Sequence, residues 1–139
     1  MIQIIVGEKG KGKTKILLEK VNEAVSSVSG NMVYLDKDTE KMYELHNQVR
    51  LINVKDYLVS NCNEFLGFIC GILSQDHDLE KIYLDSVLKI SCANQEEVPY
   101  LLDKLNEISG KFEVDFIISI SVGKADIPAA YQDSIIEAL

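Results

Sequence analysis

The stretch of sequence that decides the fold is Gly7-Glu8-Lys9-Gly10-Lys11-Gly12-Lys13-Thr14, close to the start of the 139-residue chain. The apolar, β-branched run Ile2–Val6 precedes it and is typical of a buried parallel strand. Apolar residues at helical spacing follow it from Gly12 to about Val28, and Gly30-Asn31 supplies a stop signal. The sequence therefore predicts a strand, a glycine-rich turn and a helix in immediate succession.

This stretch matches the phosphate-loop pattern G-x-x-x-x-G-K-S/T at every fixed position. Glycines let the backbone curl so that successive N–H groups point at a phosphate, and the helix that begins there adds its own unpaired N–H groups. In such a loop the Lys13 ammonium contacts the β- and γ-phosphates, and the Thr14 hydroxyl holds Mg²⁺. We expect nine residues to bind the phosphates: Gly7, Glu8, Lys9, Gly10, Lys11, Gly12, Lys13, Thr14 and Lys15.

The expected cofactors are ATP and Mg²⁺. The absence of an Asn-Lys-x-Asp guanine signature favours ATP over GTP.

The rest of the chain alternates between strand and helix patterns. Strands are predicted at 32–35, 49–54, 82–84 and 114–122, and helices at 39–48, 55–73, 95–109 and 128–136. This alternation predicts a single α/β domain over residues 1–139, with a mostly parallel sheet between two helical layers. The strand at 114–122 is expected between the first strand and the strand at 82–84. The strand at 49–54 is predicted to lie at an open edge, which is compatible with a homo-oligomer or an unidentified protein partner.

Two strands end in an aspartate that could hold the metal. They are Val33-Tyr34-Leu35-Asp36 and Ile82-Tyr83-Leu84-Asp85. Asp85, 71 residues after Thr14, is the predicted metal residue together with Thr14, because that separation leaves room for intervening helices and a strand. Asp36 is the alternative metal residue. The interpretation without a metal is that Asp85 only caps the turn that follows its strand.

The run from Ile82 to Val87 resembles the Walker B strand of RecA-type ATPases, in which apolar residues lead into Asp-Ser-Val. In that family an earlier strand ends in Asp-x-Glu, whose glutamate polarises the attacking water. Asp36-Lys37-Asp38 is similar, with Asp38 in the place of the glutamate. The resemblance implies that Asp38 and Lys13 are the catalytic residues. Aspartate is one methylene shorter than glutamate, so its carboxylate reaches less far toward the γ-phosphate. The resemblance therefore also implies slow hydrolysis.

The same resemblance implies a polar sensor residue at the end of the strand after Walker B, here Ser119 or Ser121. It extends from about Met1 to Val122. The chain ends seventeen residues later, so the DNA-binding loops of the family are expected to be missing. The fold and the nucleotide chemistry are therefore what the resemblance predicts, without recombination activity.

The charge and composition of the chain disfavour some classes of binding partner. The net charge is −8 and the pI about 4.7, which disfavours nucleic acid and anionic lipid surfaces. Residues 1–20 are the exception, with five lysines against two glutamates. The apolar start is too short for a signal peptide or a membrane span, and the three cysteines show no C-x-x-C spacing. A cytoplasmic protein is expected, with Cys62 and Cys70 serving in packing.

Arg50 is the only arginine among 14 basic residues, which excludes any mechanism that needs several arginine clamps. It also disfavours a small-molecule kinase, whose mobile lid typically contains several arginines. A kinase nevertheless stays an alternative to an ATPase. So does a non-catalytic nucleotide-binding switch that acts on a protein partner, because Ser86 stands after Asp85 where a glutamate would have favoured an enzyme.

Several other histidine, lysine and aromatic side chains are expected to have no role in binding or catalysis. His46 and His77 lack a second ligand at metal spacing and are expected on the surface. Lys124 is interpreted as a solvated lysine after a turn. The stripe formed by Tyr57, Phe65, Phe68 and Ile69 is expected to be core.

Overall fold

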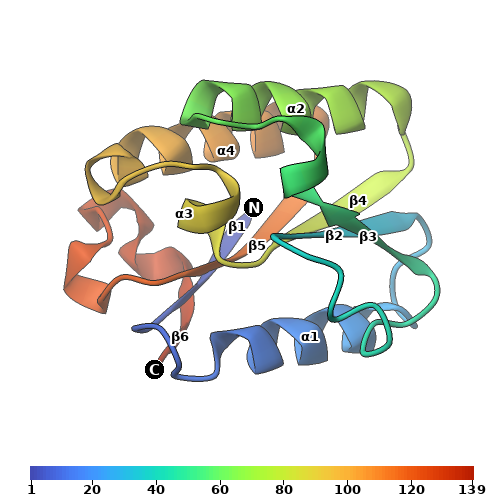
Figure 1. Ribbon diagram of the computed structural model, residues 1–139, viewed down its shortest axis with the longest axis horizontal. Helices are drawn as coiled ribbons and strands as arrows, with labels where there is room; N and C mark the ends of the chain where they lie inside the picture. The colour runs from blue at the N-terminus through green and yellow to red at the C-terminus, as the bar shows by residue number, and fades with distance from the viewer.

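The computed structural model describes residues 1–139 and contains one six-stranded sheet in which every neighbouring pair is parallel (Figure 1). The strand order is β3-β2-β4-β5-β1-β6. The strands are β1 (Ile2–Val6), β2 (Asn31–Asp36), β3 (Val49–Asn53), β4 (Leu79–Leu84), β5 (Asp115–Ile120) and β6 (Ile135–Ala138).

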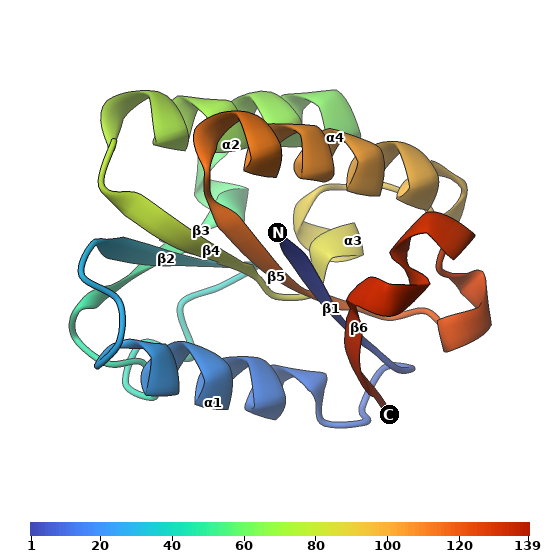
Figure 2. The same ribbon diagram turned by 180° about the vertical axis from the view of Figure 1, so that it is seen from behind.

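Helices cover both faces of this sheet. They are α1 (Lys13–Ala24), α2 (Cys62–Gln75), the single turn α3 (Val87–Ile90) and α4 (Val98–Phe112). Helix α1 lies alone on one face, and α2 and α4 lie side by side on the other (Figures 1 and 2). The predicted three-layer α/β/α architecture is confirmed.

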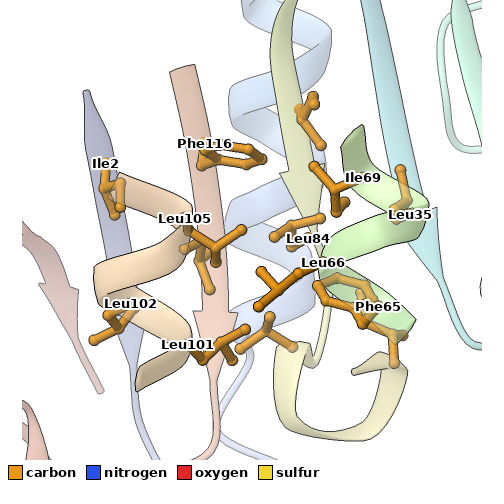
Figure 3. Packing of buried hydrophobic residues seen from close by; sticks show 14 of the residues in the cluster. Ile2, Leu35, Phe65, Leu66, Ile69, Leu84, Leu101, Leu102, Leu105 and Phe116 are labelled. Atoms are coloured by element: carbon orange, nitrogen blue, oxygen red, sulfur yellow. The ribbon is translucent and has the colours of Figure 1, made fainter. Parts of the chain in front are cut away.

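The core is split by the sheet into two apolar clusters, of 31 and 10 buried residues. In the larger cluster, Leu84 and Phe116 from the strands meet Phe65 of α2 and Leu105 of α4 (Figure 3). The smaller cluster packs α1 against the opposite face. The split follows from strand geometry, because alternate residues of a strand point to opposite faces of the sheet.

Strand β5 lies between β1 and β4, as predicted. Ile118 of β5 is in register with Ile4 of β1 on one side and with Leu84 of β4 on the other. The carboxyl ends of all these strands meet at one edge of the sheet, because the strands are parallel. The turn after β1 and the residue after β4 are therefore separated by a single strand, and this spacing builds the site described below.

The predicted helix at 39–48 is wrong, since this segment forms a series of turns. Its backbone is held by side chains. The Asp38 carboxylate accepts the N–H of Glu40 at 3.1 Å, and Asn22 of α1 binds the backbone of Glu44 and His46. Aspartate and asparagine side chains that bond nearby backbone groups compete with helical hydrogen bonds. Here that competition, together with buried Leu45, replaces a helix by a loop packed on α1.

The predicted helix from Pro128 to Ile136 is also wrong. A 3₁₀ segment (Ala129–Ser134) leads into β6, which pairs with β1 through Ile4 and Ile135. Without β6, the apolar strand β1 would lie at an open edge. Pairing satisfies its backbone groups, and the β-branched residues of β6 suit a strand. The sheet edges are therefore β6 and β3, and the prediction of an edge strand near 49–54 is confirmed.

Three other helices differ from their predicted bounds, and the first of them, predicted to extend to about Val28, ends at Ala24. The helix predicted at 55–73 is divided into a 3₁₀ turn (Val54–Tyr57) and α2, which starts after Asn61 because the Asn61 side chain accepts the N–H of Glu64 at 2.9 Å. Helix α4 continues past Gly110 to Phe112, and Glu113 with φ 53° ends it. No helix in the structure is both long enough and apolar enough to cross a membrane.

Candidate functional site

The glycine-rich loop between β1 and α1 lies at the carboxyl edge of the sheet (Figure 1). Gly10 has φ 86° and Gly12 has φ 94°, a left-handed conformation that favours glycine. Gly12 is the N-cap of α1 and provides no side-chain hydrogen bond to the first turn of the helix. The unpaired N–H groups of that turn, with the positive end of the helix dipole, are therefore available to an anion.

Lys13, the first residue of α1, is buried with an exposed fraction of only 7%. Its ammonium donates to the carbonyl oxygen of Glu8 at 2.9 Å, so the side chain folds back across the loop. Burial lowers the pKa of Lys13, and the nearby Asp85 carboxylate partly opposes that shift. A desolvated ammonium with a single carbonyl partner is well prepared to exchange it for a phosphate oxygen.

Thr14 and Asp85 come together across the strand β5. The Thr14 hydroxyl donates to Asp85 Oδ1 at 3.1 Å, although 71 residues separate the two in the chain. Asp85 directly follows β4, is 1% exposed, and is fixed by its own N–H, which donates to the Leu35 carbonyl oxygen at 3.0 Å. Two oxygen groups of the kind that Mg²⁺ prefers therefore lie at the entrance of the loop.

Asp85 accepts three further hydroxyl hydrogen bonds, the longest of them from Ser86 to Oδ1 at 3.4 Å. Ser119 of β5 donates to Oδ1 at 2.9 Å, and Tyr34 of β2 donates to Oδ2 at 2.7 Å. Of the two predicted sensor positions, Ser119 contacts the aspartate, and Ser121 lies nearer the loop. Sequence reasoning missed Tyr34. Both strands end in Tyr-Leu-Asp, and this repeat could have indicated a role for Tyr34. In the structure Tyr34 is in register with Tyr83.

Ser119 also positions the residue after Asp85. Its hydroxyl oxygen accepts the backbone N–H of Ser86 at 2.7 Å, and Ser86 adopts φ 54°, which is uncommon for a residue other than glycine. Ser86 is the N-cap of α3. The hydrogen bond therefore fixes the direction in which α3, with Lys89, leaves the end of β4.

The competing aspartate, Asp36, has different partners. It is 1% exposed, and its Oδ2 lies 2.8 Å from the ammonium of Lys41. Burial raises the pKa of Asp36, while the hydrogen bond from Lys41 acts in the opposite direction. The structure shows no hydrogen bond between Asp36 and Thr14, so the threonine of the loop is paired with Asp85 alone of the two.

Asp38, the predicted water-positioning residue, has its partners within its own turn. Its carboxylate accepts the N–H of Glu40 and lies 4.0 Å from the Lys41 ammonium, and it does not line the cleft beside the phosphate loop. Lys37, its neighbour in the chain, lines that cleft instead. The structure thus brings together Lys13, Thr14 and Asp85, and leaves Asp38 outside the group.

The cleft beside the loop has a volume of about 280 Å³. None of the residues that line it is acidic. They are Lys9, Gly10, Gly12, Lys13, Thr14, Lys37, Ser86, Lys89 and Ser121. A larger cavity of about 560 Å³ lies elsewhere, between strands β2 and β3 and helix α2, and contains none of the loop residues. We take the smaller cleft as the candidate functional one, because the glycine-rich loop and Lys13 line it.

Side chains assigned to structure are mostly placed as expected. His46 and His77 are exposed, Cys62 is buried, and Cys70 packs against the core as a free thiol. Of the aromatic stripe, Phe65 and Ile69 are core, as Figure 3 shows. Tyr57 is 54% exposed and stacks on Phe68, so its assignment to the core is wrong. The reason is the break between the 3₁₀ turn and α2, which takes Tyr57 out of the helical stripe. Arg50 lines the larger cavity at the sheet edge.

Replacement of Tyr34 by phenylalanine is expected to destabilise the protein by about 1–2 kcal/mol. Asp85 Oδ2 would lose its buried hydroxyl donor, and a hydrogen bond to a charged group contributes about that much. Thermal or urea unfolding of Tyr34→Phe measures the loss. Tyr83→Phe is the matched control, because Tyr83 stacks on Tyr34 at 6.4 Å and makes no side-chain hydrogen bond. Equal losses in both variants would contradict a specific role of the Tyr34 hydroxyl.

Comparison with known proteins provides evidence on the fold. No protein-family model matches the sequence, and a search of curated proteins gives no significant match. Among solved structures, the chain is similar to a KaiC-like protein from the hyperthermophilic archaeon Pyrococcus horikoshii, with a TM-score of 0.58 and 15% identity. The match covers 95% of this chain and 66% of the archaeal one, so this chain spans just under two thirds of that protein. Together with the all-parallel sheet between helical layers, this likeness shows that the chain has a RecA-like α/β/α fold.

Proposed function

We propose that residues 1–139 form one nucleotide-binding domain that binds ATP together with Mg²⁺ and hydrolyses it slowly to ADP and phosphate. The observation that supports this most directly is the hydrogen bond from Thr14 to Asp85 beside the buried ammonium of Lys13. A glycine-rich loop, a lysine, a hydroxyl and a strand-end carboxylate are the parts that phosphate-loop nucleotide hydrolases share.

In the proposed mechanism the backbone N–H groups of the loop and Lys13 bind the phosphates, and Thr14 and Asp85 hold the metal. The donor set suits Mg²⁺, which takes one or two protein oxygens plus phosphate oxygens and water rather than a full protein cage. The structure contains no cluster of three or more metal-binding side chains, and this site does not require one. The bound metal would neutralise charge on the phosphates, and Lys13 would stabilise the charge that develops in the transition state.

The hydrogen bond that the Asp38 carboxylate already accepts supports slow rather than fast hydrolysis. To orient a water molecule, this carboxylate must leave the N–H of Glu40 and move toward the cleft that it does not line. That movement costs free energy and reduces the fraction of molecules that are competent for the reaction.

The alternative function is a nucleotide-dependent switch without hydrolysis. The absence of any carboxylate among the cleft-lining residues favours it, because the lining then supplies charge for binding and no base for water. In this case the occupied loop would alter a contact with a protein partner.

The deciding experiment is calorimetric titration with Mg-ATP, combined with a phosphate-release assay on the same samples. We expect Asp38→Asn to lower phosphate release by about 10- to 100-fold, since positioned acid–base groups contribute at least that much, with affinity for Mg-ATP within about threefold. Asp78→Asn is the matched control, because Asp78 is exposed and precedes β4 at the opposite edge of the sheet. Binding without release in the wild-type protein selects the switch, and absence of binding refutes both functions.

A further inference from the structure

Three lysines beside the phosphate loop have no acidic partner. Lys9 belongs to the loop, Lys37 follows β2, and Lys89 lies in α3, and all three line the same cleft as Lys13. None of the three takes part in an ion pair. Separate elements thus bring three positive charges to one place in a chain whose net charge is −8.

The ammonium groups of Lys37 and Lys9 are close enough to Lys89 to affect it. Repulsion from Lys37 first, and then from Lys9, lowers the pKa of Lys89, which is exposed to solvent. In the absence of a counter-ion, Lys37 and Lys9 therefore repel Lys89, whereas lysines scattered over a surface would not repel one another in this way. An anion that binds among the three ammonium groups would remove the repulsion and gain attraction from all three.

The proposed nucleotide does not account for this charge. Within the proposed function, the β- and γ-phosphates already have the loop N–H groups, Lys13 and Mg²⁺ as partners. The triphosphate of ATP carries about −4 charges near neutral pH, and Mg²⁺ with Lys13 compensates about three of them. Three more lysines therefore exceed the charge that the triphosphate leaves uncompensated, and positive charge is left over for another anion.

On the basis of the proposed function, we propose that Lys9, Lys37 and Lys89 bind the phosphate group of a second, small phosphorylated ligand, next to the terminal phosphate of the bound nucleotide. The hydroxyl groups of Ser86 and Ser121 line the same cleft and can donate to phosphate oxygens. Lysines bind phosphate as point charges, so the site needs none of the arginine clamps that the chain lacks.

The test uses the full chain, labelled with ¹⁵N, and two successive NMR titrations. The first adds a non-hydrolysable ATP analogue with Mg²⁺ and follows the backbone amides of Gly10 and Gly12. The second adds inorganic phosphate to the loaded protein and follows the amides of Lys37 and Lys89. We expect saturable shifts in both titrations.

Lys37→Ala and Lys89→Ala are each expected to weaken phosphate binding about five- to tenfold, and to do so at least about five times more than they weaken analogue binding. Lys111→Ala is the matched control. It also removes one exposed lysine, but near the end of α4, at the opposite edge of the sheet. This control should leave both affinities within about twofold.

The outcomes separate the two proposals. Failure of the analogue to bind overturns the proposed function. Analogue binding without saturable phosphate binding overturns the second-ligand site alone. Phosphate that binds the free protein and is displaced by the analogue also overturns it, because the lysines then hold the terminal phosphate of the nucleotide itself. Equal phosphate affinity in the wild-type, Lys37→Ala and Lys89→Ala proteins would assign the phosphate to other residues.

Discussion

Replacement of Lys13 by alanine is expected to lower the affinity for Mg-ATP by about 100-fold, without loss of stability. The lost interaction is a charge-assisted contact to phosphate in a buried site, where about 2–3 kcal/mol is a reasonable magnitude and each 1.4 kcal/mol is tenfold. Stability should be unchanged or slightly higher, because Lys13 is only 7% exposed and its ammonium has one carbonyl as its hydrogen-bond partner. Its removal therefore relieves a desolvated charge.

Calorimetric titration measures the affinity of Lys13→Ala, and urea unfolding measures its stability. Lys111→Ala is the matched control, because Lys111 is exposed and lies near the end of α4, at the opposite edge of the sheet. Its affinity should stay within about threefold of the wild-type value. A Lys13→Ala protein that is folded and binds Mg-ATP as tightly as the wild type would remove the basis of the proposed function.

The lowered pKa of Lys13 also predicts a pH dependence. The unfolded chain, with the ordinary lysine pKa, binds more protons than the folded protein in the range between the two pKa values. Stability attributable to this residue therefore rises with pH across that range. The difference in unfolding free energy between Lys13→Ala and the wild type should shrink as the pH is raised toward the ordinary lysine pKa.

Asp85→Ala is expected to have the largest effect on stability, a loss of about 2–4 kcal/mol. Tyr34 and Ser119 are fully buried, and both donate hydroxyl hydrogen bonds to Asp85. Without the carboxylate these two donors have no acceptor, at a cost of about 1–3 kcal/mol each. Removal of the negative charge near Asp36 offsets part of this loss, because the Asp85 carboxylate contributes to the raised pKa of Asp36.

Asp85→Asn separates the hydrogen bonds from the charge. Its amide oxygen can still accept from Thr14 and Ser119, so the stability loss should be about half that of Asp85→Ala or less. Both variants should lose the Mg²⁺ dependence of nucleotide binding, measured by titration with and without the metal. If Asp85→Ala unfolds at the wild-type urea concentration, the hydroxyl contacts do not stabilise the fold as described. If Mg²⁺ still enhances nucleotide binding to Asp85→Asn, Asp85 is not a metal residue.

Local patterns predicted the elements that depend on local chemistry. The turn at Gly10 and Gly12 could be expected because glycine alone adopts their backbone angles at no cost. The strand that ends at Asp85 could be expected from a short apolar run, and the place of β5 between β1 and β4 was also expected. The segments at 39–48 and 128–136 could not be predicted correctly, because contacts with Asn22 and with β1, both distant in sequence, override their helical spacing.

The sequence by itself determined the glycine-rich turn, the alternation that makes a parallel sheet, and two candidate aspartates, because these depend on residue type and spacing along the chain. Only the tertiary structure decided between the aspartates, by pairing Thr14 with Asp85 and Lys41 with Asp36. It also brought the Tyr34 hydroxyl to Asp85 and turned Lys37 rather than Asp38 toward the cleft. The physical reason is that strand order and register set which side chains meet at the carboxyl edge of the sheet, and both arise from contacts between residues far apart in the sequence.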